Sequence, residues 1–384
     1  MNNVNKYLLA AGMSQLVAIS AFAAVPNTFT SGTPALASEV NENFTDLDSR
    51  LAAIEEVYAT VDLDCGADAD ALVDALDSDR NATVRTTYNV TGNCNGTYIT
   101  RSDVVIDGDG SATILGNYNE YGESLYIEKQ SNVRLRDINL QGTLTVTSNS
   151  TARLEGVAFA APVIESNDDG GNDYLPNLDI RSAYLRIQSG SLDNVSLHAN
   201  KNSAVEIRSD VTGNAFQVVA DGNSTIVTKS NAGVGLVEAI GTSSIFAAAL
   251  NATEVIAEGG SYIEVDSINA SGRGEAYGNS RIAVWGNASF AEEFYLNGNS
   301  SLEVDGDFSS DTLECQFNST MKIQGNTSIA GTFDWVSNGE VFGVSIQKGC
   351  HAQFEGTTPA NNKVNIDNYS SAIDGNWTEL YQQF

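Results

Sequence analysis

Between residues 201 and 337 the sequence repeats a short phrase, in which a Ser is followed two and four positions later by apolar residues. The phrase begins at Ser203, Ser224, Ser243, Ser261, Ser280, Ser300 and Ser319. Successive phrases begin 18 to 21 residues apart, and a regular period of about 20 residues is typical of solenoids. Because apolar and variable residues alternate within each phrase, the repeating unit is predicted to be a strand rather than a helix.

The apolar positions of the phrase predict the solenoid interior. Side chains alternate with period two along a strand, so Val205 and Ile207 and their equivalents face one side. A single turn cannot bury that face alone, and each coil must therefore stack on the next at roughly 4.8 Å. Asn tolerates tight turns, and stacked Asn amides form hydrogen bonds between coils. Corners are predicted at the Asn residues that precede most phrases: Asn202, Asn223, Asn279, Asn299 and Asn318.

A second strand is predicted after each phrase, where a Gly-Asn or Gly-Asp turn separates two apolar positions in residues 284–290, 304–308 and 323–329. Several short strands per coil with Gly and Asn corners are typical of a parallel β-helix. The chain resembles the right-handed parallel β-helix proteins, the superfamily that includes pectate lyases, and in particular exported bacterial members of uncharacterised function. The resemblance covers about residues 62–366 and implies an all-β, right-handed parallel β-helix followed by a tail or cap at residues 367–384. It carries no activity by itself.

The N-terminal residues predict export. One basic residue, Lys6, precedes an apolar run that ends in small residues, so residues 1–23 are predicted to be a signal peptide cleaved near Ala23. No later apolar run is long enough to span a membrane. We therefore expect a bacterial protein that is secreted or periplasmic. A net charge of −30 argues against nucleic acid as a partner.

Residues 24–61 are predicted to form a linker and a helix with a heptad seam. The apolar residues of that seam are Val40, Phe44, Leu47, Leu51, Ile54, Tyr58 and Val61. One interpretation is a self-associating neck, a homotrimer through residues 40–61. The other is a single amphipathic helix that lies on the body. The segment from Val25 to Glu56 also resembles a stretch that follows the signal peptide in many exported bacterial proteins.

A cap helix and two disulfides are predicted next. Leu72, Val73 and Leu76 lie on one helical face, in a segment long enough to cover the open end of a β-helix. Four Cys in an exported chain suggest disulfides. A bond between Cys65 and Cys94 would join the cap to the first coil.

The pairing of Cys315 with Cys350 is less favoured by the sequence. The repeat count places these two residues nearly two coils apart, which is further than a disulfide spans unless the end of the chain folds back.

Two charged features suggest chemistry. Arg134, Arg153 and Arg186 are predicted to stack outward on three consecutive coils, where like charges repel unless an anion neutralises them. The long spacing before Arg186 predicts a loop between Ala161 and Asn177. Its acidic residues are candidate Ca²⁺ ligands: Glu165, Asp168, Asp169 and Asp173.

These features allow two interpretations. In one, an acidic, uronate-type polysaccharide lies across the three arginines, with an Arg as the catalytic base and Ca²⁺ in the loop. In the other, Arg136 and Glu155 form a surface ion pair and the loop is a solvated turn. The chain lacks the Asn-Thr-Asp, Gly-His-Gly and Arg-Ile-Lys triplets of polygalacturonases and the Asp-His pair of pectate lyases, which counts against catalysis.

A second group of outward residues is a candidate glycan-binding site, because aromatic rings beside hydrogen-bonding groups hold sugars. Its members are Tyr262, Glu264, Arg281, Trp285 and Glu303. Cross-strand pairing explains the same residues equally well. The sequence thus predicts an exported, non-catalytic structural or interaction protein that contacts glycans, and the alternative is a polysaccharide lyase or related enzyme acting on acidic polysaccharide.

Overall fold

The computed structural model describes residues 27–28, 38, 40–47, 58–119, 122–160, 164–166, 172–174, 177–231, 233–331, 343–359, 364–367 and 369–374. The chain divides into two units, residues 1–58 and 59–384. In the first unit residues 40–47 are helical, and Phe44 and Leu47 are exposed. The predicted signal peptide lies outside the described residues. The described part of the chain contains no helix that combines the length and the apolar character needed to cross a bilayer.

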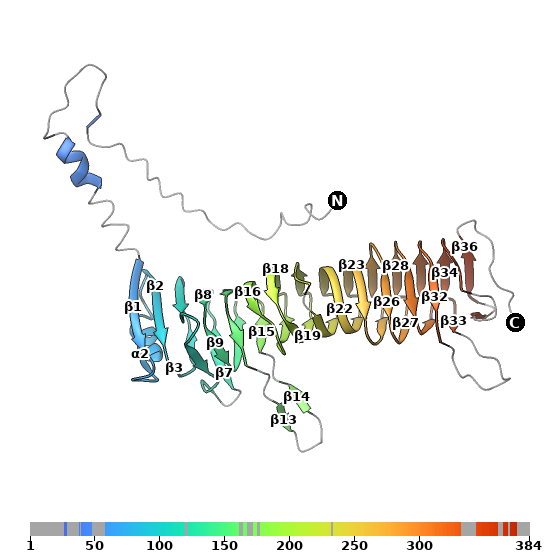
Figure 1. The fold of residues 1–384 in the computed structure, drawn as a ribbon, viewed down its shortest axis with the longest axis horizontal. Coiled ribbons are helices and arrows are strands. Elements are labelled where there is room, and N and C mark those ends of the chain that lie inside the picture. The colour runs from blue at the N-terminus through green and yellow to red at the C-terminus, as the bar shows by residue number, and fades with distance from the viewer. Residues whose placement is uncertain are drawn as a thin grey trace. The chain divides into compact units, whose positions relative to one another are not determined.

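The second unit is a parallel β-solenoid of about 13 turns (Figure 1). Its strands form three parallel stacks, which we call side 1, side 2 and side 3. Side 1 contains the strands of the Ser phrase: β2 (Arg85–Thr91), β5 (Val104–Asp107), β8 (Asn132–Arg136), β11 (Thr151–Glu155), β16 (Tyr184–Ser191), β18 (Ala204–Thr212), β20 (Thr225–Thr228), β22 (Ser244–Glu258), β23 (Tyr262–Ala270), β25 (Arg281–Val284), β28 (Ser301–Val304), β31 (Thr320–Ile323), β34 (His351–Phe354) and β36 (Ser371–Asp374).

The other two stacks complete each coil. Side 2 contains β3 (Asn93–Cys94), β6 (Thr113–Leu115), β9 (Asn139–Gln141), β12 (Ala158–Phe159), β26 (Ala288–Phe290), β29 (Phe308–Ser310) and β32 (Thr327–Ile329). Side 3 contains β4 (Thr97–Ile99), β7 (Glu123–Ile127), β10 (Thr143–Thr147), β15 (Leu178–Arg181), β17 (Ser196–Asn200), β19 (Asn214–Ala220), β21 (Gly233–Ala239), β24 (Gly274–Tyr277), β27 (Glu293–Asn297), β30 (Thr312–Cys315), β33 (Val344–Ile346) and β35 (Val364–Ile366). Several longer strands, such as β22, run around a corner and contribute to more than one side.

The predicted interior file is confirmed. The residue two positions after each phrase Ser pairs in register with its equivalent in the next coil, and each of these residues is at most 2% exposed. The file consists of Val205, Ile226, Ile245, Ile263, Ile282, Leu302 and Met321. The burial of these apolar side chains between successive coils is what holds the coils together.

The corners before side 1 are also as predicted. Asn279 and Asn299 have φ values of 70° and 62°, in the left-handed region that Asn tolerates, and the Asn299 side-chain amide donates to Asn279 Oδ1 at 3.1 Å. The phrase Ser has a role that the repeat did not reveal. The buried hydroxyl of Ser280 donates to the Ala257 carbonyl at 2.8 Å, and it thereby satisfies a main-chain acceptor at the corner.

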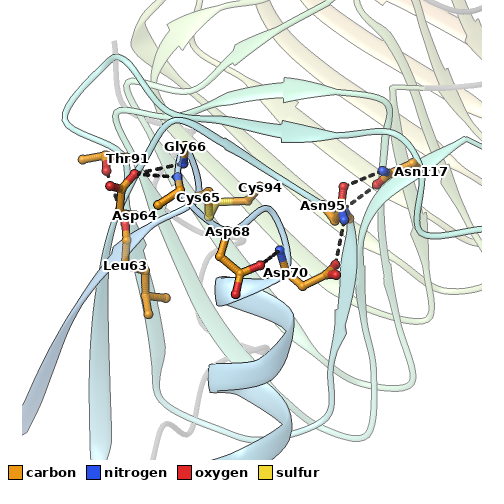
Figure 2. The surroundings of a disulfide bond; sticks show 12 residues. Leu63, Asp64, Cys65, Gly66, Asp68, Asp70, Thr91, Cys94, Asn95 and Asn117 are labelled. Carbon is orange, nitrogen blue, oxygen red and sulfur yellow. Dashed lines mark hydrogen bonds between the residues drawn. A yellow bond between two sulfur atoms is a disulfide. The ribbon is translucent and has the colours of Figure 1, made fainter.

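The N-terminal end of the solenoid is covered by α2 (Ala71–Ser78), as predicted from its amphipathic pattern, with Leu72 and Leu76 buried. Figure 2 shows the Cys65–Cys94 disulfide beside this helix. Around it, Asn117 Nδ2 donates to Asn95 Oδ1 at 2.7 Å and Asn95 Nδ2 donates to Asp70 at 2.6 Å. The disulfide and this hydrogen-bonded chain join the cap to the first coils.

One prediction for the N-terminal region is wrong. The heptad seam includes Tyr58 and Val61, but residues Tyr58–Asp64 form strand β1, which pairs with β2. The strand alternates instead with period two, because Val61 and Leu63 pack against the hydrophobic core while Asp62 between them is exposed. As a strand, this segment covers the edge of the first coil and partly buries Val61 and Leu63. A solvated helix would leave these apolar side chains in water. Leu51 and Ile54 of the seam lie outside the described residues.

The second disulfide corrects the repeat count. Cys315 and Cys350 are bonded, with their Cα atoms 5.8 Å apart. Cys315 in β30 pairs with Ile346 in β33, and Cys350 follows at the next corner. The two residues therefore lie in adjacent coils, since β30 and β33 are direct neighbours although the paired residues Cys315 and Ile346 are 31 positions apart in sequence. The predicted loop of the middle region is an insertion between β12 and β15 that carries the antiparallel pair β13 (Ile164–Ser166) and β14 (Asn172–Tyr174).

Candidate functional site

Three arginines lie side by side on the outward surface of side 1. Arg134 in β8 pairs in register with Arg153 in β11, which pairs with Arg186 in β16. The predicted stacking on consecutive coils is therefore confirmed for the strand register. We call the outward surface of β8, β11, β16 and β18 the arginine face, after its arginines Arg134, Arg136, Arg153, Arg186 and Arg208.

A pocket of about 270 Å³ opens on the arginine face. Its lining includes Arg85 from β2 beside Arg134, Arg153 and Arg186. The other lining residues are Asp103, Val104, Asn132, Thr151, Ala152 and Tyr184. Asp103 is the single carboxylate in this described lining, so the pocket carries an excess of positive charge in a chain whose net charge is −30.

One carboxylate, Glu155, is shared by three guanidinium groups. Its oxygens lie 2.7 Å from Arg153 Nε, 3.3 Å from Arg136 Nε and 3.8 Å from Arg134 Nε. The predicted surface ion pair between Arg136 and Glu155 is therefore present, but it belongs to a larger network. Asp107 also lies 3.8 Å from Arg136, so two carboxylates face these three guanidinium groups, and the face keeps the capacity to attract an anion.

Another carboxylate, Glu206 in β18, lies at the edge of the arginine face. Glu206 accepts a hydrogen bond from the Tyr184 hydroxyl at 2.9 Å and contacts Arg208 and Arg186 at 2.6 Å and 3.6 Å. Desolvation acts to raise the pKa of Glu206, but the Tyr184 bond and the two cations outweigh it and lower this pKa. Burial and the same hydrogen bond raise the pKa of Tyr184 to about 12. Tyr184 therefore acts as a neutral donor that fixes the edge of the pocket.

The chemistry available to the pocket is that of cations and hydrogen-bond donors. Burial lowers the pKa of Arg134, Glu155 acts to raise it, and Arg153 acts to lower it further. Arginine nevertheless stays protonated in proteins, and its planar fork of N–H donors matches the oxygens of carboxylates and sulfates. The arrangement suits the binding of an anionic group better than proton abstraction.

The side chains of the predicted calcium ligands lie outside the part of the chain that the structure describes. Asp168 and Asp169 are not among the described residues. Only the backbones of Glu165 and Asp173 are described, and they pair across the β13–β14 hairpin. Among the residues that the structure describes, no group of three or more His, Cys, Asp or Glu is arranged to hold a metal ion.

The second candidate group comes together on side 1, beyond the arginine face. Trp285 Nε1 and the Tyr262 hydroxyl donate to the two oxygens of Glu264, at 3.0 Å and 2.8 Å. Arg281 lies over the Tyr262 ring, 5.6 Å from its centroid, and pairs with Glu303 at 2.7 Å. The five predicted residues therefore form one connected cluster.

The sequence did not identify every member of these two sites. Arg85 and Tyr184 line the arginine pocket, and Phe246 packs edge-on against Tyr262 with the ring centroids 5.9 Å apart. Tyr184 and Phe246 occupy outward positions of the phrase, so the repeat register places them correctly. The signal that was missed is their proximity to the arginines and to Tyr262 on neighbouring coils.

Comparisons with protein-family models, with curated proteins and with solved structures find no match. The architecture is that of a parallel β-solenoid, and the function must follow from the chemistry of its own surface.

Proposed function

We propose that the protein is an exported, non-catalytic β-solenoid whose arginine face binds an acidic polysaccharide. The observation that carries this proposal is the pocket lined by Arg85, Arg134, Arg153 and Arg186 on a strongly acidic chain. A generally acidic surface repels polyanions, so binding depends on a local cationic site. Several guanidinium groups at strand spacing offer bidentate hydrogen bonds to successive carboxylate or sulfate groups.

Other features of the chain agree with an extracytoplasmic role. The chain has two disulfides, Cys65–Cys94 and Cys315–Cys350. Disulfides form and persist in oxidising compartments. The proposal includes the signal peptide at residues 1–23, right-handed winding like that of the pectate-lyase superfamily, and self-association through the seam that begins at Val40. Exposed Phe44 and Leu47 in the described part of that seam support self-association.

The test is binding of defined acidic polysaccharides by wild-type protein and by Arg153→Ala. Isothermal titration with polygalacturonate, alginate and chondroitin sulfate, and with dextran as the neutral polymer, measures affinity. We expect at least one acidic polymer to bind, dextran not to bind, and Arg153→Ala to lose about 10-fold or more in affinity, because charge-assisted hydrogen bonds are strong. Raising the salt concentration weakens binding of this kind.

A matched control is Arg273→Ala. Arg273 lies on side 3, where it pairs with Glu275 at 2.7 Å and Glu254 at 3.4 Å, so its removal deletes an equally charged and similarly paired arginine elsewhere. This variant should bind acidic polymers at least as well as wild type. Equal losses for Arg153→Ala and Arg273→Ala would show non-specific charge attraction and contradict the proposal.

The same samples separate binding from catalysis. A polysaccharide lyase generates unsaturated products, which absorb in the ultraviolet, and we expect none. Product formation that Arg153→Ala abolishes would favour the lyase alternative over a binding module. The protonated state of arginine is the physical reason for preferring binding.

A further inference from the structure

An aromatic cluster lies on side 1, outside the arginine pocket. We call Phe246, Tyr262, Glu264, Arg281 and Trp285 the platform. The Trp285 side chain follows β25 and is 56% exposed, the highest value among the tryptophans and phenylalanines of the described solenoid. The Tyr262 ring beside it is braced by the edge of Phe246 and by the guanidinium of Arg281. An exposed indole beside a braced phenol ring is a surface of the kind that stacks on the apolar face of a sugar ring.

The platform is held in place before any ligand arrives. Hydrogen bonds to Glu264 orient both the Trp285 indole and the Tyr262 hydroxyl. Burial is the main cause that raises the pKa of Tyr262, and the hydrogen bond to Glu264 is the second cause. Arg281 is fixed by Glu303. Ordering side chains in advance removes an entropic cost that a ligand otherwise meets on binding.

Glu264 is the polar centre of the platform. Each of its oxygens accepts one hydrogen bond, one from Tyr262 and one from Trp285, whereas a carboxylate offers about four acceptor positions. Acceptor capacity therefore remains on both oxygens beside the exposed indole. Two adjacent acceptors of this kind match a pair of neighbouring hydroxyl groups on a pyranose ring.

Local charge selects the ligand class. Glu264 and Glu303 carry two negative charges against one positive charge on Arg281, and the neighbouring Asp266 is exposed. A uronate or sulfated sugar placed on the indole therefore meets net repulsion. We infer that the platform binds an uncharged pyranose, with its C–H face on Trp285 and its hydroxyls donating to Glu264. This goes beyond the proposed function, since both the site and the ligand charge differ.

The experiment follows the Trp285 indole signal in ¹H–¹⁵N spectra while cellohexaose, xylohexaose or mannohexaose is added. The chain has three tryptophans, and Trp285→Phe and Trp335→Phe assign the signals. We expect one of these neutral sugars to shift the Trp285 signal and not the Trp335 signal. Trp285→Ala should weaken binding about 10-fold or more, and Glu264→Gln, which keeps the shape but loses the charge, should weaken it less. Tri-galacturonate should not shift the Trp285 signal.

The arginine variant keeps this inference separate from the proposed function. Arg153→Ala should leave neutral-sugar binding unchanged, and Trp285→Ala should leave acidic-polymer binding unchanged. If acidic polymers bind but no neutral sugar shifts Trp285, the platform inference fails and the proposed function stands. If Arg153→Ala abolishes neutral-sugar binding, the two sites are one and the inference also fails. A different outcome is that wild-type protein self-associates in sedimentation and shows no response to any sugar. If Trp285→Ala removed that self-association, the platform would be a protein contact and the inference would be overturned.

Discussion

The arginine face on side 1 and the acidic surface on side 3 present opposite charges on the same strand scaffold. We call the outward surface of β21, the end of β22, β24, β27 and β30 the acidic face. Its carboxylates are Glu238, Glu254, Glu258, Glu275, Glu293 and Glu314. In its described part, Arg273 is the one arginine that pairs with these glutamates, contacting Glu254 and Glu275. The arginine face instead has more guanidinium groups than carboxylates.

On both faces the strand spacing brings outward side chains close enough to interact. Whether the pKa of a partly buried glutamate is lowered or raised then depends on the charges of its neighbours. Burial acts to raise the pKa of both Glu206 and Glu238. On the arginine face a phenol and two cations reverse that effect for Glu206. On the acidic face Glu258, Asp221 and Glu254 reinforce it for Glu238. Parallel strands hold each column of side chains at roughly 4.8 Å intervals, so every outward residue experiences its neighbours in both adjacent coils.

The largest expected effect comes from Glu155→Gln, which removes the carboxylate shared by Arg134, Arg136 and Arg153. Arg136 keeps its contact with Asp107 at 3.8 Å, but Arg134 and Arg153 are left beside it without a carboxylate partner among the described residues, in a partly buried setting. We expect a loss of about 2–3 kcal/mol in local stability, because removing one partner leaves the others uncompensated. Hydrogen exchange of the β8, β11 and β16 amides measures this loss where it occurs, since long repeat arrays open locally.

Glu303→Gln is the matched control for Glu155→Gln. It removes a carboxylate that contacts a single guanidinium, Arg281, in an exposed pair. A pair of this type contributes about 0.2–1 kcal/mol. Equal loss of protection in the two variants would contradict the view that the arginine face depends on a shared counter-charge.

The solenoid and the register of the arginine face were predictable from the sequence, whereas the acidic face was not predicted and the pocket depends on distances that a repeat does not encode. The alternation in each phrase predicted the file from Val205 to Met321, and the register of Arg134, Arg153 and Arg186 followed from the same rule. The pocket itself did not, because a hollow depends on how the Arg85 and Tyr184 side chains lie. The Cys315–Cys350 disulfide was predicted, but the distance argument that counted against it was wrong, because coils of unequal length change the number of coils between two residues. The strand β1 was mistaken for helix because Tyr58 and Val61 fit the three-residue step of a heptad seam, whereas the alternation that burial selects runs through Val61 and Leu63.

A smaller effect is expected for Glu206→Gln, with a defined pH dependence. The folded-state pKa of Glu206 is lowered, so its ionised form stabilises the fold at pH values above the unfolded pKa of about 4.3. That contribution disappears as the pH falls through the folded-state pKa. We expect the variant to lose about 1–3 kcal/mol at pH 7 and to approach wild type in acid. Amide exchange in β16 and β18 at both pH values measures the difference.

The same variant has a spectroscopic readout. Burial is the main cause that raises the Tyr184 pKa to about 12, and the bond to Glu206 adds to it. Glu206→Gln should therefore lower the pKa of Tyr184 in an alkaline titration of its ring signals. Tyr277 on the acidic face, whose pKa is also raised to about 12 by burial and by Glu275, serves as the internal control and should not move. A simultaneous shift of both tyrosines would indicate a general loosening of the solenoid instead.

The smallest and opposite effect is expected for Glu238→Gln on the acidic face. The folded-state pKa of Glu238 is raised, so the native state holds its proton more tightly than the unfolded chain does. The favourable contribution is present below the unfolded pKa and is lost as the pH rises through the folded pKa. At pH 7 the neutral variant should therefore be more stable than wild type by about 0.2–1 kcal/mol, the range for cross-strand charge pairs, and the advantage should vanish near pH 4. Glu293→Gln, an exposed glutamate on the same face, should change stability little at either pH. A loss of stability at pH 7 for Glu238→Gln would mean that Glu238 has a stabilising partner, and the contrast between the two faces would then fail at its most sensitive residue.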